Sequence, residues 1–409
     1  MNSESSSGII ERPEIASERM TLEILASQFV EEHRRWLNPS IEAYANACPE
    51  YADEIRESFP VLIAMEEWKT NEDFARLRRQ VPADFMIPHL GNCHLLNEIS
   101  RNRTSIIYAA AQGPQKRSVA VRLLPWKSEC SLRLRDRFLR ESRLVLRLRH
   151  PNIISVDTIE EDQGYSYAVM QLVTGINLDQ VLRGLTQKLT RAKFEDRFEP
   201  QAGYLFGEQL SQVMDGYRQN YWRSIANLGL QSANALRFAH SRGTLHSDLR
   251  PGNLIVNRAG HCWLTGFCLP QHTDGSLKQQ RGQTLRYQPP ERIQGEMDER
   301  SDLYSLGCVL YELATLTPAF QAENSSALIE QILSGGYPRP CEINSEIPSS
   351  LENIICGCLA RSKQDRYQSA DELSISLVRF LNGCDVKSRV KSESKGRGKW
   401  PDVWKNKFG

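Results

Sequence analysis

The sequence has no long apolar run, no paired cysteine motif and almost no net charge. No uninterrupted apolar stretch approaches the roughly 18 residues that a membrane-spanning helix needs. The net charge of +1 gives no overall attraction to nucleic acid or to an anionic membrane surface. None of the ten cysteines has the CxxC spacing of a zinc site, and the nearest pair, Cys356 and Cys358, is more typical of buried thiols. The polar, acidic N-terminus is unlike a signal peptide, so we expect a cytoplasmic protein with reduced thiols.

The composition that remains is that of a globular chain long enough for two or three domains. Of its 409 residues, 40% are hydrophobic and 25% are charged. Residues 1–20 are rich in Ser and Glu, and we expect them to be disordered. Apolar residues at three- and four-residue steps predict a helical module over 21–88. Its stripes contain Leu25, Phe29, Val30, Ile41, Tyr44, Ala45, Tyr51, Ile55 and Phe59. They are most simply an internal core, and the alternative is a partner-binding face.

Beyond residue 88 the helical period gives way to short alternating runs, which predict a small mixed lobe over 89–170. An Arg-rich amphipathic helix, RDRFLRESRLVLRLRH, separates the third strand from the fourth. The predicted strands are CHLLNEIS, TSIIYAAA, SVAVRLLP, IISVDTI and YSYAVMQLV. Residues 176–383 are mostly helical in pattern, with a polar insertion at about 186–220.

Residues 384–409 form a basic tail in which aromatic residues are interleaved. From Lys387 onward, eight basic residues stand against two acidic ones, together with Trp400, Trp404 and Phe408. A solvated tail is the simpler interpretation, and contact with an acidic lipid surface or with nucleic acid is the alternative.

The segment 246–253, HSDLRPGN, resembles the catalytic loop of protein kinases. In that family the aspartate, here Asp248, accepts the proton of the substrate hydroxyl, and the asparagine, here Asn253, holds a Mg²⁺ ion. Eight residues with two substitutions can match by chance. However, further kinase-like motifs occur in the family's order: HPNI before the loop, and YQPPE, DLYSLG and DRYQSADEL after it.

The resemblance covers about residues 91–383 and is nearest to the bacterial Ser/Thr protein kinases of eukaryotic type. It implies an α+β fold with two lobes, namely a small five-stranded β lobe with one helix and a large helical lobe, joined by a hinge at 171–175. The helical module would then be an N-terminal extension.

The same resemblance implies roles for several further residues. Asp302 would brace the catalytic loop, Glu291 would pair with Arg366, and His246 would stack with Phe267 and Val145 between the lobes. Arg250 supplies a charge where kinases have a lysine, and Thr284 occupies the threonine position that Ser/Thr-specific kinases keep beside the catalytic Asp. Ser247 replaces the arginine that receives an activation-loop phosphate.

Two departures from the family lie on the predicted small lobe. Kinases cover the ATP phosphates with a glycine-rich loop, but here all three glycine positions carry side chains: Ser100, Asn102 and Ser105. Arg122, in VAVR, replaces the strand lysine that pairs with the helix glutamate, here Glu141. An arginine is not equivalent to a lysine at a phosphate site, because its planar fork places the charge elsewhere.

A third departure removes a metal ligand. Gly266, in Gly266-Phe267-Cys268, stands where the family has the aspartate that binds the principal Mg²⁺ ion. Glycine has no ligand atom. Losing the aspartate would therefore cost several kcal/mol of transition-state stabilisation, on the order of thousands-fold in rate. Asn253 would be the one predicted metal ligand that remains, and Mg²⁺ binding is therefore doubtful.

Apolar residues are retained where kinases enclose adenine. Ordinary lobe core would satisfy these positions equally well, so the sequence leaves ATP binding open. The predicted nucleotide-binding residues are Ile107, Ala120, Arg122, Glu141, Met170, Gln171, Val173 and Ile255.

The combined departures predict a pseudokinase, a kinase-fold protein that binds protein partners rather than phosphorylating them efficiently. The alternative is an atypical but active Ser/Thr kinase. It would need Arg101, Arg103 or Arg122 to replace the lost phosphate contacts, and a new carboxylate for the metal. The nearest acid downstream of Gly266 is Asp274. A third interpretation makes the N-terminal helices and the basic tail the working parts of a scaffold.

Overall fold

The computed structural model describes residues 22–34, 39–60, 62, 87–101, 105–127, 132–194, 221–267, 282–294 and 297–389. Contacts within the chain divide it into two units, Met1–Glu66 and Glu67–Gly409, which are described separately below. The predicted disordered segment 1–20 and the aromatic part of the basic tail lie outside the described residues.

The first unit contains the predicted N-terminal helices. Helix α1 (Leu22–Arg34) is followed by α2 (Ile41–Ala47) and the short helix η1 (Pro49–Tyr51), after which residues 52–60 are helical. The Ser40 hydroxyl begins α2 by accepting a hydrogen bond from the N–H of Ala43 at 3.2 Å. The buried side chains are those of Leu25, Phe29, Ala45, Ile55 and Phe59. The predicted stripes therefore form an internal core in this unit.

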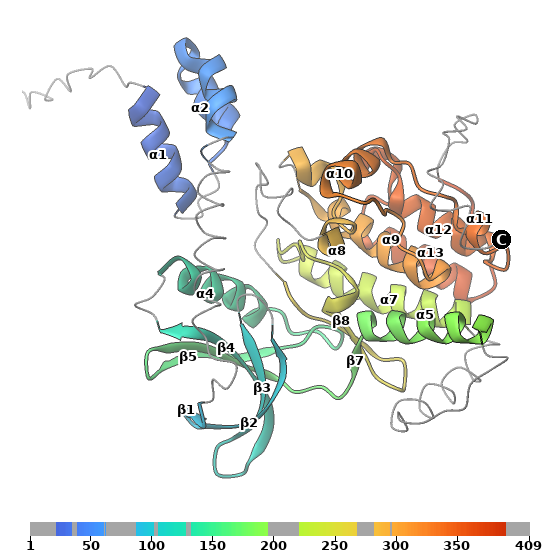
Figure 1. The fold of residues 1–409 in the computed structure, drawn as a ribbon, viewed down its shortest axis with the longest axis horizontal. Coiled ribbons are helices and arrows are strands. Elements are labelled where there is room, and N and C mark those ends of the chain that lie inside the picture. Colours follow the sequence, from blue (N-terminus) through green and yellow to red (C-terminus); the bar gives the residue numbers. More distant parts are fainter. Residues whose placement is uncertain are drawn as a thin grey trace, which may run out of the picture. The chain divides into compact units, whose positions relative to one another are not determined.

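The second unit begins with an antiparallel sheet in the order β1-β2-β3-β4-β6-β5 (Figure 1). The strands are β1 (His89–Leu90), β2 (Cys93–Arg101), β3 (Ile106–Gln112), β4 (Arg117–Lys127), β5 (Val156–Asp162) and β6 (Tyr165–Gln171). The five predicted strands are present, and the two-residue β1 makes a sixth at the edge beside β2. It was missed because two residues are too short to show an alternating pattern.

Strand β4 is buried on both faces because helix α4 (Leu132–Leu146) covers one side of the sheet. Successive strand residues point to opposite faces, so Val119 and Val121 enter one core while Ala120 and Leu124 enter the other. Phe138 of α4 belongs to the second core. This packing explains why SVAVRLLP reads as a nearly continuous apolar run.

The large lobe is helical and surrounds α9 (Glu299–Thr315), which is buried along almost its whole length. The Asp298 side chain accepts from the N–H of Arg300 at 2.9 Å, and the Ser301 hydroxyl accepts from the N–H of Asp298 at 3.2 Å, which together form a capping box. The other helices are α5 (Leu178–Phe194), α7 (Tyr221–His240), η2 (Pro251–Asn253), α8 (Gly282–Leu285), η4 (Pro290–Gln294), α10 (Ser325–Ser334), α11 (Pro340–Ile343), α12 (Ser349–Leu359), η5 (Lys363–Asp365) and α13 (Ala370–Leu381).

A small sheet has the strand order β7-β8-β9, and β8 begins directly after the catalytic-loop segment 246–253. Its strands are β7 (Ile176–Asn177), β8 (Leu254–Val256) and β9 (Cys262–Leu264). Helix α5 continues to Phe194, well into the segment predicted as an insertion, and the remainder, 195–220, lies outside the described residues.

The first residues of the predicted tail pack on the large lobe. Val386 is buried, and its carbonyl accepts from the Asn353 side chain at 2.9 Å. The guanidinium of Arg389 lies 4.8 Å from the Tyr367 ring centroid and forms an ion pair with Glu372. The packed domain therefore extends beyond residue 383, where the basic tail was expected to begin.

The cysteines of the described residues are free thiols. Cys356 and Cys358 are buried in α12, and burial raises the pKa of Cys356 to about 11. Both are thus buried thiols, as their spacing had suggested. Among the described residues, no group of three or more His, Cys, Asp or Glu side chains could hold a metal ion, and no helix is long and apolar enough to cross a membrane.

Candidate active site

Asp302 of α9 holds the catalytic loop by its backbone. Its carboxylate accepts from the N–H of His246 at 2.8 Å and from the N–H of Ser247 at 2.9 Å, and it contacts Nε2 of His240 at 2.8 Å. Burial alone would raise the pKa of Asp302, but these hydrogen bonds and the nearby histidines hold it below its ordinary value. The carboxylate is therefore a fixed negative charge under the loop.

The predicted catalytic residues Asp248 and Asn253 bind to each other. Nδ2 of Asn253 donates to the Asp248 carbonyl at 2.7 Å and to Oδ2 of its carboxylate at 2.9 Å. The Nε group of Arg250 lies 3.3 Å from the same Oδ2, and its NH1 lies 3.9 Å from Asp179 at the start of α5. One carboxylate oxygen of Asp248 thus has two donors within the loop. No hydrogen bond joins it to Thr284 among the described residues.

Gly266 adopts a left-handed backbone conformation, with φ of 77°. A Cβ atom at this residue would lie 2.7 to 2.9 Å from three side-chain atoms of Asn253. The amide of Asn253 therefore occupies the space that a side chain at 266 would need. A residue with a side chain would be strained by the backbone as well.

His246 and Phe267 pack against each other, with ring centroids 4.4 Å apart and ring planes tilted by 37°. A hydrogen bond of 3.0 Å joins Nε2 of His246 to the Thr265 carbonyl. Burial lowers the pKa of His246, so its ring is neutral near pH 7. Phe267 belongs to the main core of the large lobe, against which Val145 of α4 packs, and this contact connects the two lobes.

Arg122 on β4 reaches Glu141 on α4, with NH2 and Oε2 3.3 Å apart. Its Nε donates to the hydroxyl of Ser105 at 3.1 Å, and its guanidinium lies 5.1 Å from the Phe138 ring centroid. The second oxygen of Glu141 accepts from Nε of Arg137 at 3.0 Å. Two guanidiniums thus share one carboxylate, which leaves excess positive charge at this end of the sheet.

The residues predicted to enclose adenine belong to one apolar cluster. Ala120 and Met170 are buried in it, and Ile107 and Val173 pack against them. Ile255 reaches the same cluster from β8 of the large lobe. The positions are therefore brought together, which is compatible both with an adenine pocket and with ordinary core.

The predicted hinge, 171–175, begins at Gln171, whose N–H donates to the Ser155 carbonyl at 3.0 Å. Residues 172–175 form no backbone–backbone hydrogen bond with other described residues. Among the described residues, the backbone groups of 172–175 therefore have no backbone partner.

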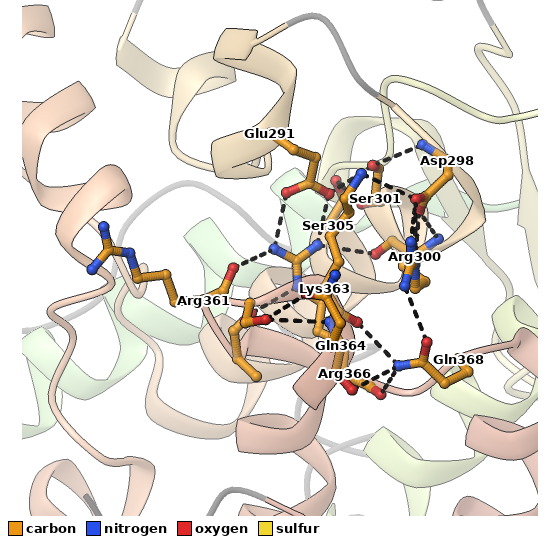
Figure 2. Close-up of polar contacts among 12 residues, drawn as sticks. Glu291, Asp298, Arg300, Ser301, Ser305, Arg361, Lys363, Gln364, Arg366 and Gln368 are labelled. Atoms are coloured by element: carbon orange, nitrogen blue, oxygen red, sulfur yellow. Dashed lines mark hydrogen bonds and ion pairs between the residues drawn. The ribbon is translucent and has the colours of Figure 1, made fainter.

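Glu291 and Arg366 form a buried ion pair with two contacts, of 2.7 and 2.9 Å, shown in Figure 2. The Ser301 hydroxyl also donates to Glu291 at 2.7 Å, and the Arg366 Nε donates to the Ala360 carbonyl at 2.7 Å. Arg366 is fully buried, so the paired geometry is needed to offset the desolvation of both charges. This pair connects the YQPPE motif to the end of the domain.

Three residues that contact the candidate site were not predicted from the sequence. Arg137 pairs with Glu141, and Arg292 donates to both the Ser247 carbonyl and the Gln288 side chain. Arg137 had a detectable signal, since it precedes Glu141 by four residues on one helix and such pairs face each other. Arg292 had none, because its contact with Ser247 joins residues far apart in the chain.

Residues 94–376 match the protein kinase domain family, and the chain belongs to that family. The two-lobed α+β fold expected from the resemblance is therefore the fold of this protein.

Several bacterial Ser/Thr protein kinases are similar to this chain. Serine/threonine-protein kinase PknH of Mycobacterium bovis is 28% identical over 299 residues, which cover 72% of this chain and 45% of that protein. Probable serine/threonine-protein kinase PknB of Bifidobacterium longum is 27% identical over 308 residues, with 72% and 40% covered. The chain thus spans less than half the length of these relatives.

Proposed function

We propose that this protein is a pseudokinase of the Ser/Thr kinase type, which acts by binding a protein partner and transfers phosphate weakly or not at all. The observation that carries the proposal is that the Asn253 amide occupies the space that a side chain at position 266 would need. Position 266 offers no ligand atom, and the Asn253 amide lies in the space that a side chain at 266 would need while its Nδ2 group donates to Asp248. This donor set does not fit the Mg²⁺ ions on which the family's phosphoryl transfer depends.

The proposal includes nucleotide binding without Mg²⁺. The apolar cluster around Ala120 and Met170, together with the open backbone of residues 172–175, could take an adenine ring. Arg122 would face the phosphates, since its NH1 group has no hydrogen-bond partner among the described residues. Without an aspartate at 266, bound phosphates meet less negative charge and have less need of a metal.

A thermal-shift titration with ATP, with EDTA and with Mg²⁺ or Mn²⁺, tests the nucleotide part. We expect the melting temperature to rise with ATP in EDTA and to gain little from metal. A rise that requires metal would contradict this expectation and favour an active enzyme. No rise in any condition would leave a scaffold that binds partners without nucleotide.

An atypical but active Ser/Thr kinase is the second candidate. Asp248 and Asn253 are retained, and the Arg122–Glu141 pair forms, which favours it. Autophosphorylation with labelled ATP and Mg²⁺, compared between the wild type and Asp248→Asn, decides the matter. Robust labelling that the substitution abolishes would overturn the pseudokinase proposal.

A further inference from the structure

Ser247 is the residue of the catalytic loop where this chain lacks the family's phosphate-receiving arginine, and its backbone is held from two sides. It is buried and has a left-handed φ of 63°, which is strained for a residue other than glycine. Its N–H donates to Oδ1 of Asp302 at 2.9 Å. Its carbonyl accepts a hydrogen bond from NH1 of Arg292.

Arg292 follows Glu291 directly and comes from the terminal part of the activation segment, residues 284–294. Its side chain is buried, with the residue only 3% exposed. The same NH1 group donates to Oε1 of Gln288, also buried, at 2.6 Å. A buried guanidinium is costly unless it is hydrogen-bonded and its charge is balanced. Ser247 is thus held between two buried side chains, because Asp302 accepts from its N–H and Arg292 donates to its carbonyl.

We propose that Arg292 is a positioning residue that attaches the terminal part of the activation segment to the catalytic loop without phosphorylation. In kinases that keep an arginine on the catalytic loop, that arginine would bind a phosphate on the activation segment. Here the direction is reversed, because Arg292 of the activation segment donates to the Ser247 carbonyl of the catalytic loop. Two hydrogen bonds to α9 complete the attachment, because Ser305 donates to the Tyr287 carbonyl at 2.8 Å and Ser301 donates to Glu291 at 2.7 Å. The surface built by residues 284–294 is then formed permanently. This inference does not depend on whether the cleft binds nucleotide or transfers phosphate.

Hydrogen–deuterium exchange of the full chain tests the proposal in the wild type first. Peptides that cover 244–250 and 284–292 should exchange equally slowly before and after phosphatase treatment. A tenfold acceleration after phosphatase treatment would overturn the proposal, because it would mean that a phosphate orders the segment.

Variants then test Arg292 itself. Arg292→Met keeps the chain length but removes the charge and the donors, and we expect exchange in these two peptides to accelerate about tenfold, which corresponds to about 1.4 kcal/mol. Arg292→Lys should restore part of the protection, because an ammonium group can still donate to the Ser247 carbonyl. Arg237→Met, the same change at an exposed arginine of the same lobe, should leave both peptides unchanged.

Local acceleration separates positioning from general support of the lobe. If Arg292→Met speeds exchange equally in α9 and α12, or leaves the wild-type rate unchanged, the proposal is wrong. If this variant does not fold, Arg292→Lys and the phosphatase comparison still decide the question.

Discussion

The buried support of the catalytic loop and the predicted phosphate-facing side of the candidate site differ in their residues. The support retains Asp302 and the buried Glu291–Arg366 pair, all with well-formed hydrogen bonds. The predicted phosphate-facing side has Gly266 where the resemblance implies a metal-binding aspartate, and Arg122 where it implies a lysine. The difference teaches that burial and hydrogen bonding can hold the shape of the loop whether or not the predicted phosphate-facing residues carry out chemistry.

The buried support should be the more sensitive region to substitution. Arg366→Met leaves the carboxylate of Glu291 buried without its cation, so we expect a loss of about 3–5 kcal/mol in the free energy of unfolding. Urea denaturation measures this loss. The matched change Arg237→Met breaks an exposed ion pair with Asp371 and should cost less than about 1 kcal/mol. Equal losses in the two variants would show that the buried pair stabilises the fold no more than the exposed pair does.

Introducing an aspartate at position 266 should not create Mg²⁺-dependent phosphate transfer. Gly266→Asp forces a side chain into a left-handed residue and against Asn253, and we expect a loss of about 1–3 kcal/mol with no gain of Mg²⁺-dependent labelling. Gly383→Asp is the control, because Gly383 has a similar φ of 74° but no atom within 4 Å of the added Cβ. The difference between the two variants isolates the Asn253 contact, and a Gly266→Asp protein that labels itself with ATP would contradict the prediction.

The Ser105 hydroxyl is expected to help hold Arg122 in place. Ser105→Ala removes the acceptor of a part-buried charged donor, which should cost about 1–2 kcal/mol in thermal or urea unfolding. Ser118→Ala, on an exposed residue of β4, should stay within about 0.5 kcal/mol of the wild type. A Ser105→Ala protein as stable as this control would mean that the hydrogen bond from Arg122 to Ser105 does not contribute to the free energy of unfolding.

The neutral His246 of the catalytic loop should produce a modest pH dependence of stability. Burial lowers the pKa of His246 from its ordinary value of 6.5, so below that pH the unfolded chain binds a proton that the folded chain refuses. Stability is therefore full above about pH 6.5 and falls as the pH drops, by at most about 1.4 kcal/mol per pH unit for one group. His150 adds to the same trend, because burial lowers its pKa too.

Urea unfolding at pH 7 and pH 5.5 measures this dependence. His246→Gln should reduce the difference in unfolding free energy between the two pH values, while His94→Gln, at an exposed residue of β2, should leave it unchanged. An undiminished difference in His246→Gln would assign the effect to other groups.

Much of this architecture was predictable because its signals are local or repeat in a known order. The alternating runs that became β2 to β6 and the amphipathic pattern of α4 each depend on residues within one element. The ordered motifs around HSDLRPGN predicted the kinase fold. The extent of α5 and the packing of residues 384–389 were not predictable, since a polar segment shows no pattern that reveals a distant surface on which it packs.

The sequence by itself determined the kinase fold and the identity of the altered residues, above all the glycine at 266. Only the tertiary structure decided what surrounds these residues: the Asn253 amide fills the space beside Gly266, Arg122 binds the hydroxyl of Ser105, and the Ser247 carbonyl accepts from Arg292. The physical reason is that the residue type at a single position is enough to show that a ligand atom is absent. The side chain that takes up its space or its hydrogen bond is chosen by packing between segments that lie far apart in the sequence.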